Sequence, residues 1–189
     1  RCIKVGWCGN RLNSPKHFNL NSIVIDLTSI KHYVALNYNE KHYFFEFEEE
    51  SIKKRNDWDH KISTIRDNIP GFEFKHIEQM AYAAGPGSYT GARLAFTFLD
   101  TLNLIINKKF YAFSNLTALQ HNHPERVAVM KGSKNDYFYR YNDTDHYCES
   151  LDEIPKDTAY VVLQNDQLKL KNMIELNCEV ISKNILDLV

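Results

Sequence analysis

The sequence predicts an α/β protein, because an antiparallel meander over residues 22–49 precedes a strand–helix–strand unit. Residues 80–84 form an apolar run typical of a buried strand. A glycine-rich turn at 85–91 leads into a long helix that ends near Asn107, and residues 110–113 form the next short strand. Because such a helix usually crosses over between parallel neighbours, we expect a mixed sheet covered by helices.

Composition indicates a folded protein and excludes two broad classes. The chain has 189 residues, of which 43% are hydrophobic and 25% charged, as is ordinary for a globular protein. Its net charge of −1 gives no general attraction to nucleic acid or to an anionic membrane. No apolar run approaches the ~20 residues that span a bilayer, so we expect a cytoplasmic protein with no membrane segment.

The chain divides into three predicted regions: a leader at 1–21, a first α/β lobe at 22–122 and a second, shortened lobe at 123–189. The leader is basic and polar, starts with Arg and has no periodicity, so we expect it to be disordered or only loosely attached to the domain. The four cysteines contain no C-x-x-C pair, which favours reduced thiols. Cys2, Cys8 and His17 match no closed zinc spacing, so a leader metal cluster is poorly supported.

The first lobe opens with strands at 23–27, 32–37 and 42–48, the third alternating aromatic and acidic residues. A mixed charge run at 48–55 predicts a solvated loop. A helix then runs from Asp57 to about Ile69, with one stripe formed by Trp58, Ile62, Ile65 and Ile69. Pro70 and Gly71 end this helix.

The long helix, with Thr90 as its predicted cap, carries an unusually wide apolar arc of roughly 200°. Its members are Leu94, Ile105, Phe98, Leu102, Ala95, Ile106, Leu99, Ala92 and Phe96, with Asn103 between them. A helix on one sheet needs about half of that arc. The helix is therefore sandwiched between two layers of its own domain, or it meets another protein on its spare face.

The remainder of the chain predicts smaller elements. A short helix ends near Gln120, and strands at 126–130 and 137–141 form a hairpin. We then expect a strand at 160–163, a helix near 167–174 and a strand at 178–181. His121 and His123 form an H-x-H pair with no third ligand placed, which favours a surface loop.

The glycine-rich turn could cradle a phosphate, but its details fit poorly. A Walker loop needs Lys and Ser or Thr after its last glycine, where this chain has Ala92 and Arg93. The glycines at 85, 87 and 91 also miss the dinucleotide spacing by one position. Asp26 ends the first strand and could hold magnesium, although a turn-forming Asp is the commoner case. We favour a structural turn and keep the phosphate site as the alternative.

A family resemblance rests on this turn. Residues 84–93, A-G-P-G-S-Y-T-G-A-R, resemble the G-P-G-S-[FY]-T-G-x-R signature of the TsaB (YeaZ) family. The strand at 23–28 resembles the family's opening l-a-l-D-T-S segment, and 110–119 its next strand and helix. The resemblance covers about residues 22–142. The signature residues are Gly85, Pro86, Gly87, Ser88, Tyr89, Thr90, Gly91 and Arg93.

The resemblance implies an actin/hexokinase-like fold with two ribonuclease-H-like lobes, the second abbreviated. It also implies a non-catalytic subunit that pairs with a TsaD-like catalytic subunit and, with a TsaE-like ATPase, makes N6-threonylcarbamoyladenosine at position 37 of ANN-decoding tRNAs. ATP and metal would then bind the partner and not this chain, and tRNA would be reached only through the complex. The implied partner interface is Trp58, Ile62, Ile65, Ile69, Leu94, Phe98 and Leu102. Without its partner, the same face can close on a second copy.

Three departures and two rival functions accompany this resemblance. Asp26-Leu27-Thr28 replaces the family's D-T-S. The family's H-S segment at the first helix is replaced by Asp57-Trp58-Asp59-His60, and its hairpin Asp-Ala-Arg by Lys131-Gly132-Ser133. A stand-alone ATP-dependent kinase or transferase of the same fold is the alternative function, motivated by Asp26 and the turn. A metallopeptidase of the M22 type would need paired histidine ligands, which the sequence does not offer.

Overall fold

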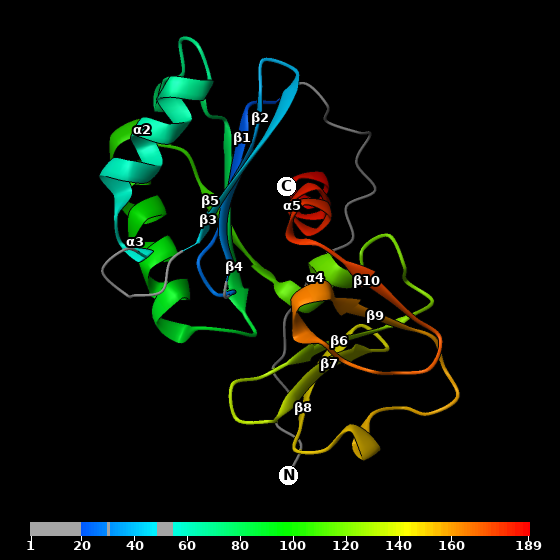
Figure 1. The fold of residues 1–189 in the computed structure, drawn as a ribbon. Helices are drawn as coiled ribbons and strands as arrows, with labels where there is room; N and C mark the ends of the chain where they lie inside the picture. Colours follow the sequence, from blue (N-terminus) through cyan, green and yellow to red (C-terminus); the bar gives the residue numbers. More distant parts are fainter. Residues whose placement is uncertain (1–19, 30, 49–54) are drawn as a thin grey trace.

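The computed structural model describes residues 20–29, 31–48 and 55–189, which form two five-stranded mixed sheets with helices around them (Figure 1). Residues 1–19 of the predicted leader (1–21) and residues 49–54 of the charge run lie outside the described residues, as do Cys2, Cys8 and His17. Asn21, which the sequence placed in the leader, is anchored to the fold. Its side-chain oxygen accepts the Asn39 amide proton at 2.8 Å, and its own amide donates to Glu78 at 3.0 Å.

The first sheet has the order β3-β2-β1-β4-β5. Its strands are β1 (Ser22–Asp26), β2 (Lys31–Tyr38), β3 (Lys41–Glu48), β4 (Gln79–Gly85) and β5 (Phe110–Ser114). The opening meander is antiparallel, while β4 runs parallel to both β1 and β5. The predicted antiparallel meander over residues 22–49 and the predicted parallel strand after the long helix are therefore both confirmed.

Two helices cover the outer face of this sheet, α2 (Trp58–Asn68) and α3 (Tyr89–Ile106), with a short 3-10 turn η1 (Phe74–His76). Figure 1 shows both helices on the side of the sheet away from the rest of the chain. The core beneath them joins alternate residues of β1 and β2, such as Ile25 and Leu36, to Ile65 and Leu99 of the helices. Alternation along the strands sends these side chains to the outer face.

The second sheet has the order β10-β9-β6-β7-β8. Its strands are β6 (Val127–Lys131), β7 (Tyr137–Tyr141), β8 (Thr144–Cys148), β9 (Tyr160–Leu163) and β10 (Met173–Leu176), and two 3-10 turns, η2 (Leu151–Glu153) and η3 (Gln164–Asp166), accompany them. The predicted hairpin of β6 and β7 and the predicted strand β9 are confirmed.

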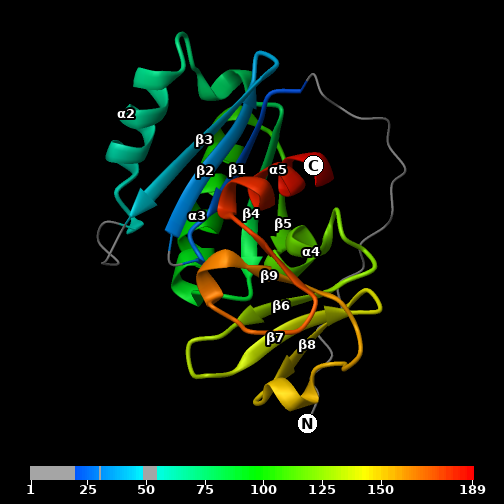
Figure 2. The ribbon, with the colours of Figure 1, turned by 45° about the vertical axis from the view of Figure 1, so that its right-hand side comes forward.

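Helices α4 (Asn115–Gln120) and α5 (Cys178–Leu188) lie between the two sheets (Figure 2). They share one core with the inner faces of both sheets, which includes Val24, Leu119, Ala128 and Ile185. The C-terminal helix α5 packs against β1 and β2, so the end of the chain returns to the first sheet. The predicted lobe boundary near residue 122 falls in the loop between α4 and β6.

Two predictions for the last quarter of the chain are wrong. Residues 167–174 are not helical, because Met173 begins the edge strand β10, which pairs in parallel with β9. Residues 178–181 are not a strand but the first turn of α5, whose N-cap Asn177 accepts the amide proton of Val180 at 2.9 Å. The strand β8 was not predicted at all.

Candidate functional site

The signature turn follows β4 and lies against the end of β1. Gly87 has a φ of +148°, and a Cβ there would lie 2.7 Å from the carbonyl oxygen of Thr28. A Cβ on Gly91 would lie 1.7 Å from the carbonyl oxygen of Leu27. Neither contact is possible for a side-chain atom, so these glycines let the turn and the start of α3 approach β1 closely.

Hydrogen bonds fasten the turn in this position. The Ser88 amide donates to the carbonyl oxygen of Thr28 at 2.8 Å. The buried Asn115, at the start of α4, donates from Nδ2 to Thr28 Oγ1 at 2.8 Å and to the Pro86 carbonyl at 3.0 Å. The turn is therefore packed on the chain's own backbone, which supports the structural interpretation over a phosphate cradle.

Asp26 behaves as a turn former. Its buried carboxylate accepts the Thr28 amide and hydroxyl protons, both at 2.6 Å, and the Ser29 hydroxyl proton at 2.9 Å. Both carboxylate oxygens are thus engaged by residues two and three positions ahead. In the described segments, no three His, Cys, Asp or Glu side chains gather in a way that could hold a metal ion.

The cap of α3 is Ser88 and not Thr90 as the sequence suggested. Ser88 Oγ accepts the Gly91 amide proton at 3.2 Å, which places the cap one residue before Tyr89, while Thr90 is exposed. Two other signature side chains, Tyr89 and Arg93, are exposed. Tyr89 is 75% exposed. The guanidinium carbon of the exposed Arg93 lies 5.8 Å from the centre of the Tyr89 ring.

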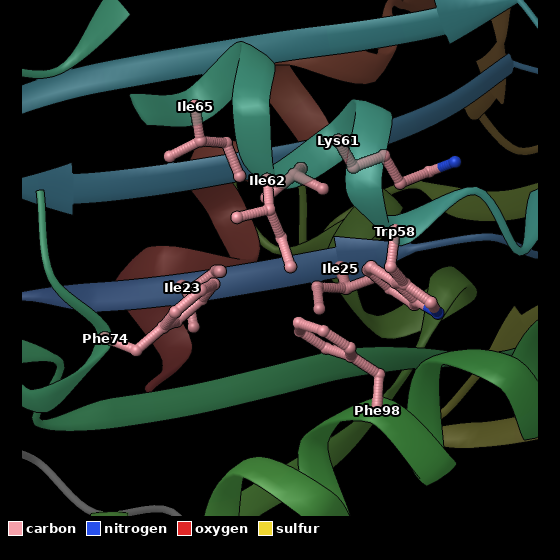
Figure 3. Close-up of a pocket in the computed structure, with 9 residues that line it drawn as sticks. Ile23, Ile25, Trp58, Lys61, Ile62, Ile65, Phe74 and Phe98 are labelled. Atoms are coloured by element: carbon pink, nitrogen blue, oxygen red, sulfur yellow. The ribbon is translucent and has the colours of Figure 1, made fainter. Parts of the chain in front are cut away.

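Four predicted interface residues lie half-buried along the seam between α2 and α3: Trp58, Ile62, Leu94 and Phe98. The rings of Trp58 and Phe98 stack with centroids 3.7 Å apart and planes 10° from parallel. Figure 3 shows these two rings face to face above β1, with Ile62 beside them, in a narrow apolar pocket. These side chains bridge the helices and keep part of their surface accessible.

Three other predicted interface residues belong to the chain's own core. Ile65 and Ile69 of the α2 segment and Leu102 of α3 are all buried against the first sheet. We therefore remove them from the candidate docking face. The apolar stripe of α2 is the face that a helix on a single sheet must bury, so its spacing alone could not separate core from interface.

The outward side of α3 adds residues that the predicted interface lacked. Leu104 is 82% and Ile105 is 73% exposed, and Phe96 is also exposed. Ile105 and Phe96 were members of the wide apolar arc, whereas Leu104 lay outside it and only its hydrophobicity signals it. We define the docking face as the accessible parts of Trp58, Ile62, Leu94, Phe98, Leu104 and Ile105.

Lys61 of α2 was also missed. Its side chain is fully buried, and its amine lies 5.1 Å from the ring centre of Phe47 and 5.8 Å from that of Trp58. Attraction between an ammonium group and an aromatic face is worth about 0.5–2 kcal/mol. A lysine three residues after a tryptophan is a common sequence pattern, so the sequence did not predict that Lys61 would be buried against aromatic rings.

Three buried or partly buried groups away from the docking face have raised pKa values. Burial raises the pKa of Asp166 to about 6, although it accepts the Lys131 amide proton. Burial, with the nearby Asp26 carboxylate, raises the pKa of the Cys178 thiol to about 12, and the same two causes raise the pKa of Tyr33. Cys178 is therefore a protonated, unreactive thiol at neutral pH.

Part of the chain matches a known protein family. The family model described as TsaD, tRNA N6-adenosine threonylcarbamoyltransferase, matches residues 68–182. This range contains the signature turn, α3, α4 and all five strands of the second sheet. The chain belongs to the TsaD family.

Solved structures agree with the TsaD family at the level of the fold. YeaZ from Pseudomonas aeruginosa superposes with a TM-score of 0.60 at 12% identity, covering 87% of this chain and 90% of that one. An uncharacterized protein from the same organism, described as similar to peptidase YeaZ, gives 0.64 at 11% identity, covering 88% and 90%. The predicted α/β fold of the actin/hexokinase type is thus confirmed. No curated protein matches the chain.

The TsaD family assignment does not by itself identify the residues of the docking face. The matched range starts at residue 68, after most of α2, so it includes Phe98 but not Trp58.

Within the described ranges, none of the helices is both long and apolar enough to cross a lipid bilayer.

Proposed function

We propose that this chain is a non-catalytic scaffold subunit of the complex that makes N6-threonylcarbamoyladenosine at position 37 of ANN-decoding tRNAs. It docks onto a TsaD-like catalytic subunit through the outer face of α2 and α3. Family membership supports the reaction. The observation that carries the docking role is the pair of large apolar side chains, Leu104 and Ile105, on the outward side of α3.

The exposed apolar surface continues into the half-buried seam. Phe98 and Leu94 lie about two and three turns before Ile105 along α3, and Trp58 and Ile62 continue the surface onto α2. Contiguous apolar surface of this kind commonly marks a protein interface. Aromatic residues at its centre, such as the Trp58–Phe98 pair, are typical anchors of binding energy.

The packing of the signature turn supports a scaffold in place of an ATP-dependent enzyme. The positions that would have to open for a phosphate, Gly87 and Gly91, are occupied on one side by the carbonyl oxygens of Thr28 and Leu27. In this proposal ATP and metal bind the TsaD-like partner, a TsaE-like ATPase joins the assembly, and tRNA is reached only through the complex.

A mixing experiment tests the proposal. The purified chain and a purified TsaD-like subunit from the same source are combined at micromolar concentration and followed by size-exclusion chromatography with light scattering. We expect a one-to-one complex that Leu104→Asp and Ile105→Asp abolish, because each places a charge in a dry contact. Val180→Asp, at an exposed apolar position on α5, is the matched control and leaves the complex intact.

Three outcomes count against the proposal. The first is a wild-type chain that stays separate from the TsaD-like subunit. The second is self-association that the partner does not displace, which would assign the face to a second copy. The third is ATP binding by the isolated chain in calorimetry, which would favour a stand-alone kinase or transferase.

A further inference from the structure

The four residues Arg55-Asn56-Asp57-Trp58 lead into α2, which begins at Trp58. Each of them makes a different contact, and together these contacts set how α2 begins and how it lies relative to α3. A hydrogen bond joins Arg55, before α2, to Ser88, the cap of α3, and the rings of Trp58 and Phe98 stack between the two helices.

Arg55 provides the hydrogen bond. Its Nη1 donates to Ser88 Oγ at 2.7 Å, and Ser88 Oγ also accepts the Gly91 amide proton as the cap of α3. The segment before α2 is therefore tied directly to the first turn of α3. Arg55 Nε is buried with no hydrogen-bond partner in the described part of the chain. Because an unpaired buried donor costs free energy, stability alone does not explain an arginine here.

Asn56 orients the tryptophan. Its side-chain oxygen accepts the indole proton of Trp58 at 3.1 Å, and its carbonyl oxygen accepts the Trp58 amide proton at 3.0 Å. The indole is thus fixed at its polar end while its face stacks on Phe98. Asp57 accepts the His60 amide proton at 3.0 Å and caps α2.

We infer that Arg55 and Asn56 are positioning residues that hold α2 and α3 in the docking arrangement before the partner arrives. This inference rests on the proposed function. A surface whose side chains are already ordered loses less conformational entropy on binding. The contacts act on the seam, where Trp58 and Phe98 form the centre of the docking face.

Binding to the TsaD-like subunit tests the inference through Arg55→Met, Arg55→Lys and Asn56→Ala. We expect Arg55→Met and Asn56→Ala each to raise the dissociation constant about tenfold, the change expected when one such hydrogen bond is lost. Arg55→Lys keeps the charge and recovers part of the affinity. Lys169→Met removes an exposed cation from the other lobe and serves as the matched control.

A second measurement needs no partner. Trp7 and Trp58 are the two tryptophans of the chain, so Trp7→Phe makes Trp58 the sole reporter. In that background we expect Asn56→Ala to raise the mobility of the indole, seen as lower fluorescence anisotropy, while the midpoint of thermal unfolding moves little. A merely structural role would lower the midpoint and leave the indole of the folded fraction unchanged.

The outcomes separate this inference from the proposed function. Failure of the wild-type chain to bind contradicts the proposed function. Wild-type binding with unchanged affinity in Arg55→Met and Asn56→Ala overturns the positioning role while leaving the docking proposal intact. A loss of affinity matched by a loss of folded protein also overturns it.

Discussion

Gly91→Ala is the substitution whose effect follows most directly from the geometry of the signature turn. The added Cβ would lie 1.7 Å from the carbonyl oxygen of Leu27 and 2.5 Å from its carbon. The start of α3 has to retreat from β1 by roughly 1.3 Å before that contact reaches 3.0 Å, and a close-packed core resists such a shift. The three nearest atoms belong to the backbone of Leu27 and Thr28, so no side-chain rotation can relieve the contact.

The magnitude comes from two opposing effects. Alanine stabilises a helix by about 1 kcal/mol relative to glycine. Overpacking costs about 1–3 kcal/mol when neighbours can adjust and more when they cannot. We expect Gly91→Ala to lower the free energy of unfolding by about 3 kcal/mol, a large part of the roughly 5–15 kcal/mol that a domain has.

Urea unfolding followed by circular dichroism measures this loss, with Gly71→Ala as the control. Gly71 has a φ of +72°, but a Cβ there meets nothing within 4 Å. Its substitution carries only the conformational cost of a left-handed residue, about 1 kcal/mol. A Gly91→Ala protein as stable as the Gly71→Ala protein would show that α3 does not approach β1 as described.

Three further predictions concern other parts of the molecule. Ser88→Ala removes the cap of α3 and should lower the free energy of unfolding by about 1 kcal/mol in the same urea assay; an unchanged midpoint would place the cap elsewhere. Asp166 has a folded-state pKa of about 6, above its ordinary value of 3.8, so its protonation stabilises the fold below pH 4 and that contribution is lost as the pH rises through 6. Asp166→Asn should therefore reduce the change of the unfolding midpoint with pH between pH 4 and 7. An unaltered pH dependence would contradict the raised pKa of Asp166. Leu104→Ser should leave the midpoint of thermal unfolding unchanged, because this side chain is 82% exposed, and a marked drop would mean that it is buried.

Local signals predicted the first lobe well. The alternation in β2 and β3, the stripe of α2 and the turn before α3 each point to one structure, and pairing in the sheet agrees with them. The interface was harder, because Ile65 and Phe98 are equally apolar in the sequence. Only the packing shows that Ile65 is buried against the first sheet and that Phe98 stays accessible.

The last quarter of the chain was mispredicted for identifiable reasons. The apolar residues at 168, 170, 173 and 174 fit neither the helical period of 3.6 nor the strand period of 2. Parallel pairing with β9 makes the second half of this segment a strand. For α5, the cap at Asn177 and the spacing of Cys178, Ile181 and Ile185 were usable helix signals. For β8, Asn142 and Asp143 both have positive φ, the conformation of a tight hairpin turn, which an Asn-Asp pair can signal.

The affinity of the Leu104→Asp protein for a TsaD-like subunit tests the docking claim most directly. We predict a wild-type complex with a micromolar or tighter dissociation constant. We also predict at least a hundredfold loss of affinity in the variant, with an unchanged midpoint of thermal unfolding. Equal affinity of the wild-type and Leu104→Asp proteins would contradict it, because the outward side of α3 would then contribute nothing to partner binding.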